Sequence, residues 1–228
     1  MHDFNLDEFP HGRHFDDYIY ARLQRLPERE LIEFPPGCLP AHFQPAAVLL
    51  CCWPTADHRV EVVLTRRSTS LSSHQGQVSF PGGRVDDQDP SFAAAALREA
   101  WEELAIDPAH VAIMGRLDDA WSRHGHHVIP YVGWMDTRPV MQANPAEVDE
   151  VLIADLQTLM LPGSERRHEV PGDGKAGQTH VTRAFAWQGG YVWGLTADLL
   201  YELILWLRGQ PSNRGRQRLQ RIREFSVR

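Results

Sequence analysis

Residues 63–106 read VLTRRSTSLSSHQGQVSFPGGRVDDQDPSFAAAALREAWEELAI. The end of this stretch predicts a helix, because an alanine run follows Asp89, a good N-cap residue, and Pro90, which suits the first helical position. Residues 77–80 predict a strand ahead of it, and Pro81-Gly82-Gly83 predicts a turn where the backbone can approach a ligand closely. We therefore expect the order strand, glycine turn, loop and acidic helix.

The predicted helix carries three carboxylates on one face. Glu99, Glu102 and Glu103 lie within one turn, because residues three and four apart share a face of a helix. Carboxylates this close repel one another unless a cation lies between them or water solvates them fully. Hard oxygen ligands suit Mg²⁺ or Mn²⁺, which usually bridge to substrate phosphates. The sequence therefore predicts that these three glutamates bind Mg²⁺ or Mn²⁺.

This stretch resembles a known motif. Gly83, the run Arg98-Glu99-Ala100-Trp101-Glu102-Glu103 and Ile106 resemble the Nudix box, G-x5-E-x7-R-E-U-x-E-E-x-G-U, where U is aliphatic. The gap from Gly83 to Arg98 is one residue longer than in the box, and the first acidic position has no Glu; Asp86, Asp87 or Asp89 can take its place. Ala105 stands where the box has Gly, and a left-handed backbone there would cost about 1 kcal/mol.

The preceding residues resemble one branch of the same superfamily. Residues 64–83 are similar to L-T-x-R-S-x-x-L-x-x-H-x-G-Q-V-x-F-P-G-G, the motif of the coenzyme A pyrophosphatase branch of the Nudix hydrolases, with Ser72 where many members carry Arg. The resemblance implies hydrolysis of the diphosphate of coenzyme A, or of acyl or oxidised coenzyme A, to adenosine 3′,5′-bisphosphate and 4′-phosphopantetheine.

The resemblance also implies roles for individual residues. Glu99, Glu102, Glu103 and Arg98 are expected at the catalytic centre, where the three glutamates hold the metal and Arg98 pins a glutamate or makes a structural salt bridge. Glu147, Glu150 or a helical glutamate is expected to act as general base. For His74 and Gln77, hydrogen bonds that only fix the loop are an equal alternative to substrate contacts. The residues expected to bind substrate are Arg67, Ser68, His74, Gly76, Gln77, Gly82 and Gly83.

The resemblance implies an α/β (α+β) fold, the Nudix α/β/α sandwich with a mixed central sheet, plus N-terminal and C-terminal helical extensions. Periodicity alone supports only the α/β or α+β class. We expect an N-terminal helical extension at residues 1–44, a Nudix hydrolase domain at 45–210 and an Arg-rich tail at 211–228.

Local patterns predict the remaining elements. Ile19, Leu23 and Leu26 form the apolar stripe of a peripheral helix within 13–33, which packs on the domain or makes a homodimer contact. Pro130 marks its strand as an edge or bulged strand. The tail arginines are expected on a solvated or disordered segment, with a nucleic-acid arm as the alternative. The other expected elements are a hairpin of strands 46–53 and 60–65, strands 111–117 and 126–134 around an irregular segment 118–124, a strand or helix from 144, a mobile loop 161–178, a hairpin of 181–187 and 191–193, and a helix 196–207.

Composition limits the partners and the compartment. The formal net charge of −7 disfavours nucleic acid as the main partner, so a polyanionic substrate must meet a locally basic site. Cys38, Cys51 and Cys52 do not suggest a disulfide framework, and no apolar run is long enough to cross a membrane. No secretory signal is apparent, and we expect a cytoplasmic protein.

Two alternatives stay open from sequence. The first is a Nudix hydrolase of another substrate, such as ADP-ribose, a dinucleoside polyphosphate or an oxidised nucleotide. The second is a catalytically silent Nudix domain that binds a nucleotide, which the altered first acidic position and Ala105 keep open.

Overall fold

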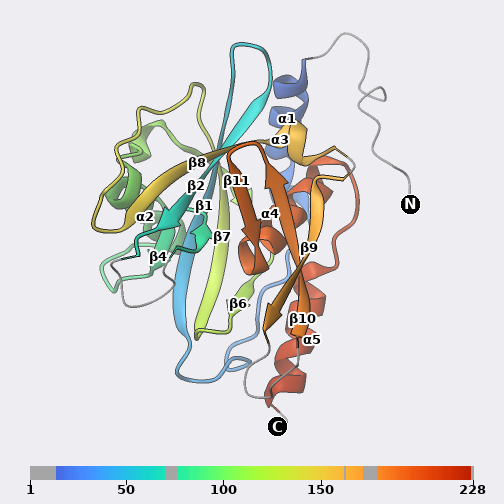
Figure 1. Ribbon diagram of the computed structural model, residues 1–228. Coiled ribbons are helices and arrows are strands. Elements are labelled where there is room, and N and C mark those ends of the chain that lie inside the picture. Colours follow the sequence, from blue (N-terminus) through green and yellow to red (C-terminus); the bar gives the residue numbers. More distant parts are fainter. Residues whose placement is uncertain (1–13, 70–75, 162, 172–178, 227–228) are drawn as a thin grey trace.

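A computed structural model describes residues 14–69, 76–161, 163–171 and 179–226 (Figure 1). Its centre is a sheet of eight strands in the order β3-β2-β1-β7-β5, with β4 paired to β1, β6 to β7 and β8 to β2. Strands β1 and β7 run parallel and the other pairs are antiparallel, so the sheet is mixed as expected. The strands are β1 Gln44–Pro54, β2 Val60–Arg67, β3 Val78–Ser79, β4 Gly82–Arg84, β5 Ala112–Arg116, β6 Ala120–Ser122, β7 His126–Trp134 and β8 Val148–Asp155.

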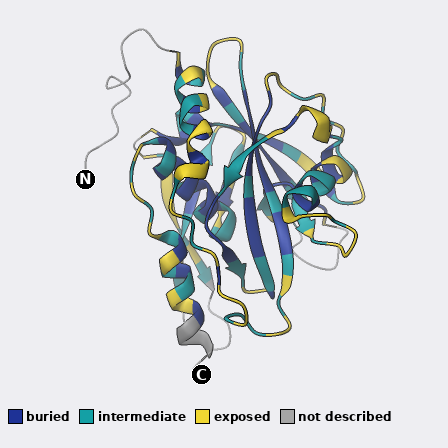
Figure 2. Ribbon diagram, turned by 180° about the vertical axis from the view of Figure 1, so that it is seen from behind, coloured by how far each residue is buried: buried dark blue, intermediate teal, exposed yellow. Residues whose placement is uncertain are grey.

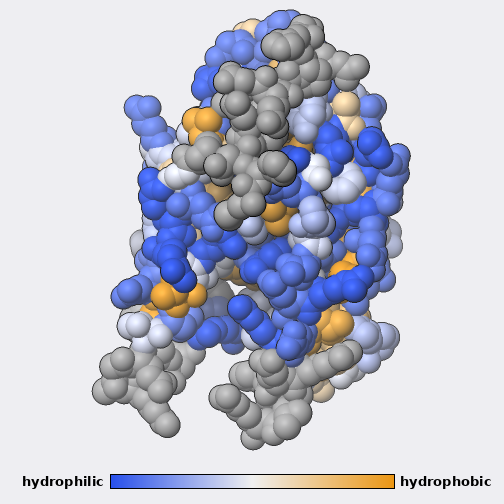
Figure 3. All heavy atoms as spheres, turned by 90° about the vertical axis from the view of Figure 1, so that its right-hand side faces the viewer, coloured by the Kyte–Doolittle hydropathy of each residue, from blue (hydrophilic) through white to orange (hydrophobic). Residues whose placement is uncertain are grey.

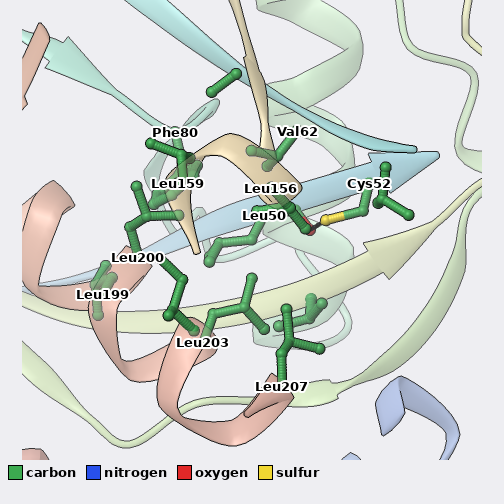
Figure 4. Packing of buried hydrophobic residues seen from close by; sticks show 14 of the residues in the cluster. Leu50, Cys52, Val62, Phe80, Leu156, Leu159, Leu199, Leu200, Leu203 and Leu207 are labelled. Carbon is green, nitrogen blue, oxygen red and sulfur yellow. Dashed lines mark hydrogen bonds between the residues drawn. The ribbon is translucent and has the colours of Figure 1, made fainter. Parts of the chain in front are cut away.

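Helices cover both faces of this sheet. Residues of β1 alternate between two cores, because successive side chains of a strand point to opposite faces. Leu49 and Cys51 pack against α2 (Phe92–Leu104), whereas Leu50 and Cys52 pack against α4 (Gly194–Leu207), as Figure 4 shows for Leu199, Leu200 and Leu203. The shorter helices are α1 Phe15–Gln24, η2 Leu26–Glu28, η3 Pro108–His110 and α3 Leu156–Leu159. This arrangement confirms the predicted α/β/α sandwich.

The predicted N-terminal helix is confirmed as α1 and η2. Ile19, Leu23 and Leu26 are all buried in the same core as α4, so the stripe packs within the chain. Tyr18 and Arg22 of α1 donate to the backbone carbonyls of Leu207 and Trp206 at the end of α4. Figure 2 shows the buried strands between helices that are exposed on their outer sides.

A second, antiparallel sheet lies beside the first, in the order β11-β10-β9. Its strands are β9 Glu165–Pro171, β10 Thr179–Trp187 and β11 Gly190–Trp193. The hairpin β10–β11 was predicted, but the expectation of a mobile loop over 161–178 is wrong for 165–171. These residues pair with β10 along their whole length, so a long-range partner decides their conformation. The part of that expectation that covers 172–178 lies outside the described residues.

The start of the acidic helix differs from the prediction. The cap of α2 is Ser91, whose Oγ accepts from the N–H of Ala94 at 3.1 Å, and not Asp89. Gly82 and Gly83 belong to strand β4, opposite Val48 and Ala47 of β1, instead of forming a turn. Ala105 ends the helix with φ of 56°, so the left-handed backbone for which the sequence predicts strain is present there.

Strand β7 is internal, so the edge alternative for Pro130 is wrong. It pairs with β1 on one side and with β5 and β6 on the other. The break between β5 and β6 lies opposite Pro130, whose missing N–H cannot join the ladder there, while its carbonyl accepts from Leu117. The predicted irregular segment 118–124 contains β6, and its Asp118 and Asp119 are buried.

The Arg-rich tail is a helix, α5 Arg214–Ser226, and not a solvated segment. Arg218 and Ile222 are buried at 5% and 3% exposure, because the helix docks against the end of α4 and against β6. The face of the molecule seen in Figure 3 is mostly hydrophilic, with scattered hydrophobic residues. None of the helices in the described part of the chain is long and apolar enough to cross a membrane.

Candidate active site

The acidic face of α2 lies against strand β4. Glu103 is only 4% exposed, and one of its oxygens accepts from the N–H of Gly82 at 3.3 Å. The pKa of Glu103 is raised to about 8, chiefly by burial; the charges of Glu99 and Glu147 also raise it, whereas the hydrogen bond from Gly82 and the charge of Arg67 lower it. Burial also raises the pKa of Glu99.

The two glycines of β4 make this close approach possible. A Cβ on Gly83 would lie 2.4 Å from Oε2 of Glu99, and a Cβ on Gly82 would lie 2.4 Å from the carbonyl oxygen of Ala47. Gly82 also has φ of 152°, which L side chains rarely adopt. The structure therefore explains why glycines precede the acidic helix, although they lie in a strand.

Arg98 connects the glutamates to the loop before the helix. Its Nη1 donates to Glu99 at 3.0 Å and to Glu102 at 2.9 Å, which matches the expectation that it pins a glutamate. Its Nε and Nη2 each lie 3.0 Å from the carboxylate of Asp89, and this bidentate pair lowers the pKa of Asp89. Of the three aspartates that could replace the missing glutamate, Asp89 makes this pair, while Asp86 approaches Arg98 only to 3.9 Å.

We call residues 64–83 the substrate motif. The residues of this motif at the end of β2 lie beside the acidic helix α2. Arg67 exchanges backbone hydrogen bonds with Gly76 and Gln77, and its charge opposes the pKa shift of Glu103. Ser68 is buried, its N–H donates to the carbonyl of Glu147 at 2.8 Å, and its hydroxyl bonds to Asp149. Ser68 thus fixes the loop locally, and its contact with substrate stays a prediction. His74 lies outside the described residues.

The two candidate bases lie in different surroundings. The charge of Glu147 raises the pKa of Glu99 and Glu103, so Glu147 faces the acidic helix. Asn144 supports it, because its N–H donates to the carbonyl of Glu103 at 2.8 Å and its amide nitrogen lies 3.3 Å from Glu147. Glu150 instead bonds to Arg66 at 2.8 Å on the exposed surface of β2 and β8. The structure places Glu147, and not Glu150, beside the glutamates.

The donor set fits a hard divalent cation in its chemistry. Glu99, Glu102, Glu103 and Glu147 offer carboxylate oxygens, the ligands that Mg²⁺ and Mn²⁺ prefer. Among the described residues, no three acidic, histidine or cysteine side chains converge closely enough to hold an ion. Glu99 and Glu102 are instead both paired with the guanidinium of Arg98.

A buried ionic cluster away from this site was not predicted. Glu202 of α4 is fully buried between Arg29 and Arg218, and it also accepts from the N–H of Asp118. The signal was present in the sequence, because a glutamate inside the apolar run TADLLYELILWL needs a buried cationic partner. The sequence could not show which arginine supplies it.

Comparison with known proteins agrees with this geometry. The NUDIX domain family matches residues 43–171. Nudix hydrolase 22, chloroplastic, of Arabidopsis thaliana is 36% identical over 74% of this chain, which spans 58% of that protein. A Photorhabdus laumondii protein named uncharacterized Nudix hydrolase NudL is 37% identical over 74% of this chain and 88% of its own length. A MutT/nudix family protein from Enterococcus faecalis has a TM-score of 0.46 at 16% identity, covering 83% of this chain and 70% of that one.

An acidic helix against a glycine strand within an α/β/α sandwich defines the class of Nudix domains. The match over residues 43–171, together with the relative of which 88% is covered, shows that the chain belongs to the Nudix hydrolase family.

Proposed function

We propose that the protein hydrolyses the diphosphate linkage of coenzyme A or a derivative of it, giving adenosine 3′,5′-bisphosphate and 4′-phosphopantetheine. The observation that carries the proposal is that the substrate motif and the acidic helix are tied to one segment: the N–H of Ser68, at the end of β2, donates to the carbonyl of Glu147, and the N–H of Asn144 donates to the carbonyl of Glu103. A diphosphate placed there would contact a guanidinium on one side and the metal-binding carboxylates on the other.

We infer that Glu99, Glu102 and Glu103 hold Mg²⁺ or Mn²⁺. Such an ion, when bound, neutralises phosphoryl oxygens and lowers the pKa of a bound water. The remaining roles, which are binding the diphosphate and accepting the proton, belong to residues of the chain. Arg67 orients the diphosphate, the β4 backbone at Gly82 and Gly83 allows close approach, and Glu147 accepts a proton from the attacking water. The ion pair between Arg98 and Asp89 holds helix α2 against the loop that precedes it.

The test is Glu103→Gln, assayed on coenzyme A with each metal. Turnover should fall by orders of magnitude, because the buried ligand loses its charge while its shape remains. Glu150→Gln is the matched control, since Glu150 is exposed and paired with Arg66 away from the site. Near wild-type turnover by Glu103→Gln would contradict the assignment of the metal ligands.

Product analysis separates this proposal from its alternatives. Mass spectrometry of the products in ¹⁸O-water shows which phosphorus is attacked. Brisk cleavage of ADP-ribose without cleavage of coenzyme A would favour another Nudix substrate, and binding without turnover in Mg²⁺ or Mn²⁺ would favour a silent module. The cytoplasmic location is also a proposal, since two plant relatives are named chloroplastic and mitochondrial.

A further inference from the structure

The three-stranded sheet carries an aromatic cluster that the proposed chemistry does not use. The rings of His168 on β9 and Trp193 on β11 stack with centroids 4.7 Å apart and planes at 24°. The hydroxyl of Tyr191 lies 3.0 Å from Nδ1 of His168 and fixes that ring. Trp193 and Tyr191 are nevertheless 37% and 38% exposed, so large aromatic surface remains open to solvent.

The strand register explains why these rings point outward. His168 lies opposite Thr182, Trp193 opposite Ala184 and Tyr191 opposite Ala186, and residues paired across strands share a face. The alternate residues Phe185 and Val192 are buried in the core with α4. The aromatic cluster of His168, Tyr191 and Trp193 therefore lies on the face turned away from the core of its own sheet, over small side chains of β10.

The strand that carries Tyr191 and Trp193 contacts the substrate motif. Strand β11 lies against both β3 and β8, as its position beside the main sheet in Figure 1 shows. Strand β3 directly follows Gln77 and pairs with β2 next to Arg67, so β11 meets the main sheet at the end of β2 that approaches Glu103. The aromatic cluster therefore lies on a strand that contacts the substrate motif, and this makes it a candidate contact surface for a part of the substrate other than the diphosphate.

A cation adds to the character of the cluster. Ala184 of β10 pairs with Arg166 on β9 and with Trp193 on β11, so Arg166 and Trp193 lie on the same face of the sheet. Arg166 is exposed. An exposed aromatic stack beside an arginine suits a nucleotide, because a flat base stacks on the rings and a phosphate can meet the guanidinium.

We propose that this aromatic cluster binds the nucleobase of the substrate, with Trp193 as the stacking surface. The proposal rests on the proposed function, since the diphosphate must lie near Arg67. It makes Trp193 a base-binding residue, and His168 and Tyr191 residues that position its ring; none of the three takes part in bond cleavage. Stacking on an aromatic side chain is sequence-tolerant and strong enough to dominate the recognition of a base.

Binding of adenosine 3′,5′-bisphosphate, measured by calorimetry without metal, tests the proposal independently of turnover. Trp193→Ala should raise the dissociation constant about tenfold or more, and Trp193→Phe should recover most of the loss because a ring remains. Val181→Ala, which removes an exposed apolar residue from the other face of the same sheet, should bind like wild type. Inorganic pyrophosphate, which has no base, should bind all four proteins equally.

The outcomes distinguish this inference from the proposed hydrolysis. Loss of bisphosphate binding in Trp193→Ala, with pyrophosphate binding intact, supports the base site even if coenzyme A is not cleaved. Equal affinity of wild type and Trp193→Ala for the bisphosphate overturns it, even if coenzyme A is cleaved. If coenzyme A is a substrate, Trp193→Ala should raise KM and leave kcat unchanged; a fall in kcat alone would also overturn it.

Discussion

At the scale of single residues, the site depends on carboxylates placed where water cannot solvate them. Glu103 is buried against the backbone of Gly82, with Glu99 and Glu147 close enough to repel it. In the metal-free protein, such a group keeps its proton at a pH where an ordinary carboxyl has lost it. This placement lowers the stability of the empty site, and a bound cation would restore that stability.

The pH dependence of stability follows from this residue. The pKa of Glu103 is about 8 in the folded chain, against 4.5 for an ordinary glutamate. Below pH 4.5 both states are protonated. As the pH rises toward 8 the unfolded state releases the proton and the folded state does not, so stability falls across this window.

Glu103→Gln should remove this penalty. In the presence of a chelator, the variant should melt at least about 3 °C above wild type at pH 8, equivalent to ~1 kcal/mol, and close to wild type at pH 4.5. Thermal unfolding followed by circular dichroism at both pH values checks it. A lower melting temperature for the variant at pH 8 would show that the carboxylate is well compensated in the metal-free protein.

At the scale of elements, the left-handed end of α2 gives a second prediction. Ala105 has φ of 56°, where an L side chain is strained and glycine is not. Ala105→Gly should therefore raise the free energy of unfolding by about 0.5–1 kcal/mol, measured with urea. Ala93→Gly, within the helix, should lower it by about 1 kcal/mol. If Ala105→Gly and Ala93→Gly lower the free energy of unfolding by equal amounts, the backbone at Ala105 is unstrained.

Elements with a local signal were predictable, and those decided by distant partners were not. The apolar run 46–53 had to form a buried strand, and Ile19, Leu23 and Leu26 had to share one helical face. Strand β9 reads ERRHEVP, with charges that favour a loop, and it is a strand because β10 pairs with it. The glutamates of the candidate site were chosen from their helical spacing, and their role as metal ligands stays a prediction. The role of Asp89 was not predictable, because its partner Arg98 lies inside α2 and the path of the chain before the helix decides whether the two side chains meet.

At the scale of the whole molecule, α5 docks where the described part of the N-terminal extension also docks. Gly215, Arg218 and Ile222 form its buried stripe, a helical spacing that the many arginines concealed. The N–H of Gly215 donates to Asp118 at 3.0 Å, and a side chain at this position would collide with that carboxylate. Asp118 also binds Arg29 from the N-terminal extension, so both extensions dock at one point.

Replacing Arg218, which lies at the centre of this contact, should destabilise the folded protein. Arg218 binds Glu202 at 2.7 Å and Asp198 at 2.9 Å with only 5% exposure, and without it Glu202 keeps only Arg29 as a cationic partner. Because breaking a buried ion pair from one side leaves an uncompensated charge, Arg218→Ala should lower the free energy of unfolding by about 3 kcal/mol. Arg221→Ala, on the exposed side of the same helix, should change it by less than about 0.5 kcal/mol. Urea unfolding of the full chain measures both, and equal effects would mean that α5 does not dock on α4 in solution. In that case its arginines would be available to an anionic partner, as the nucleic-acid alternative for the tail requires.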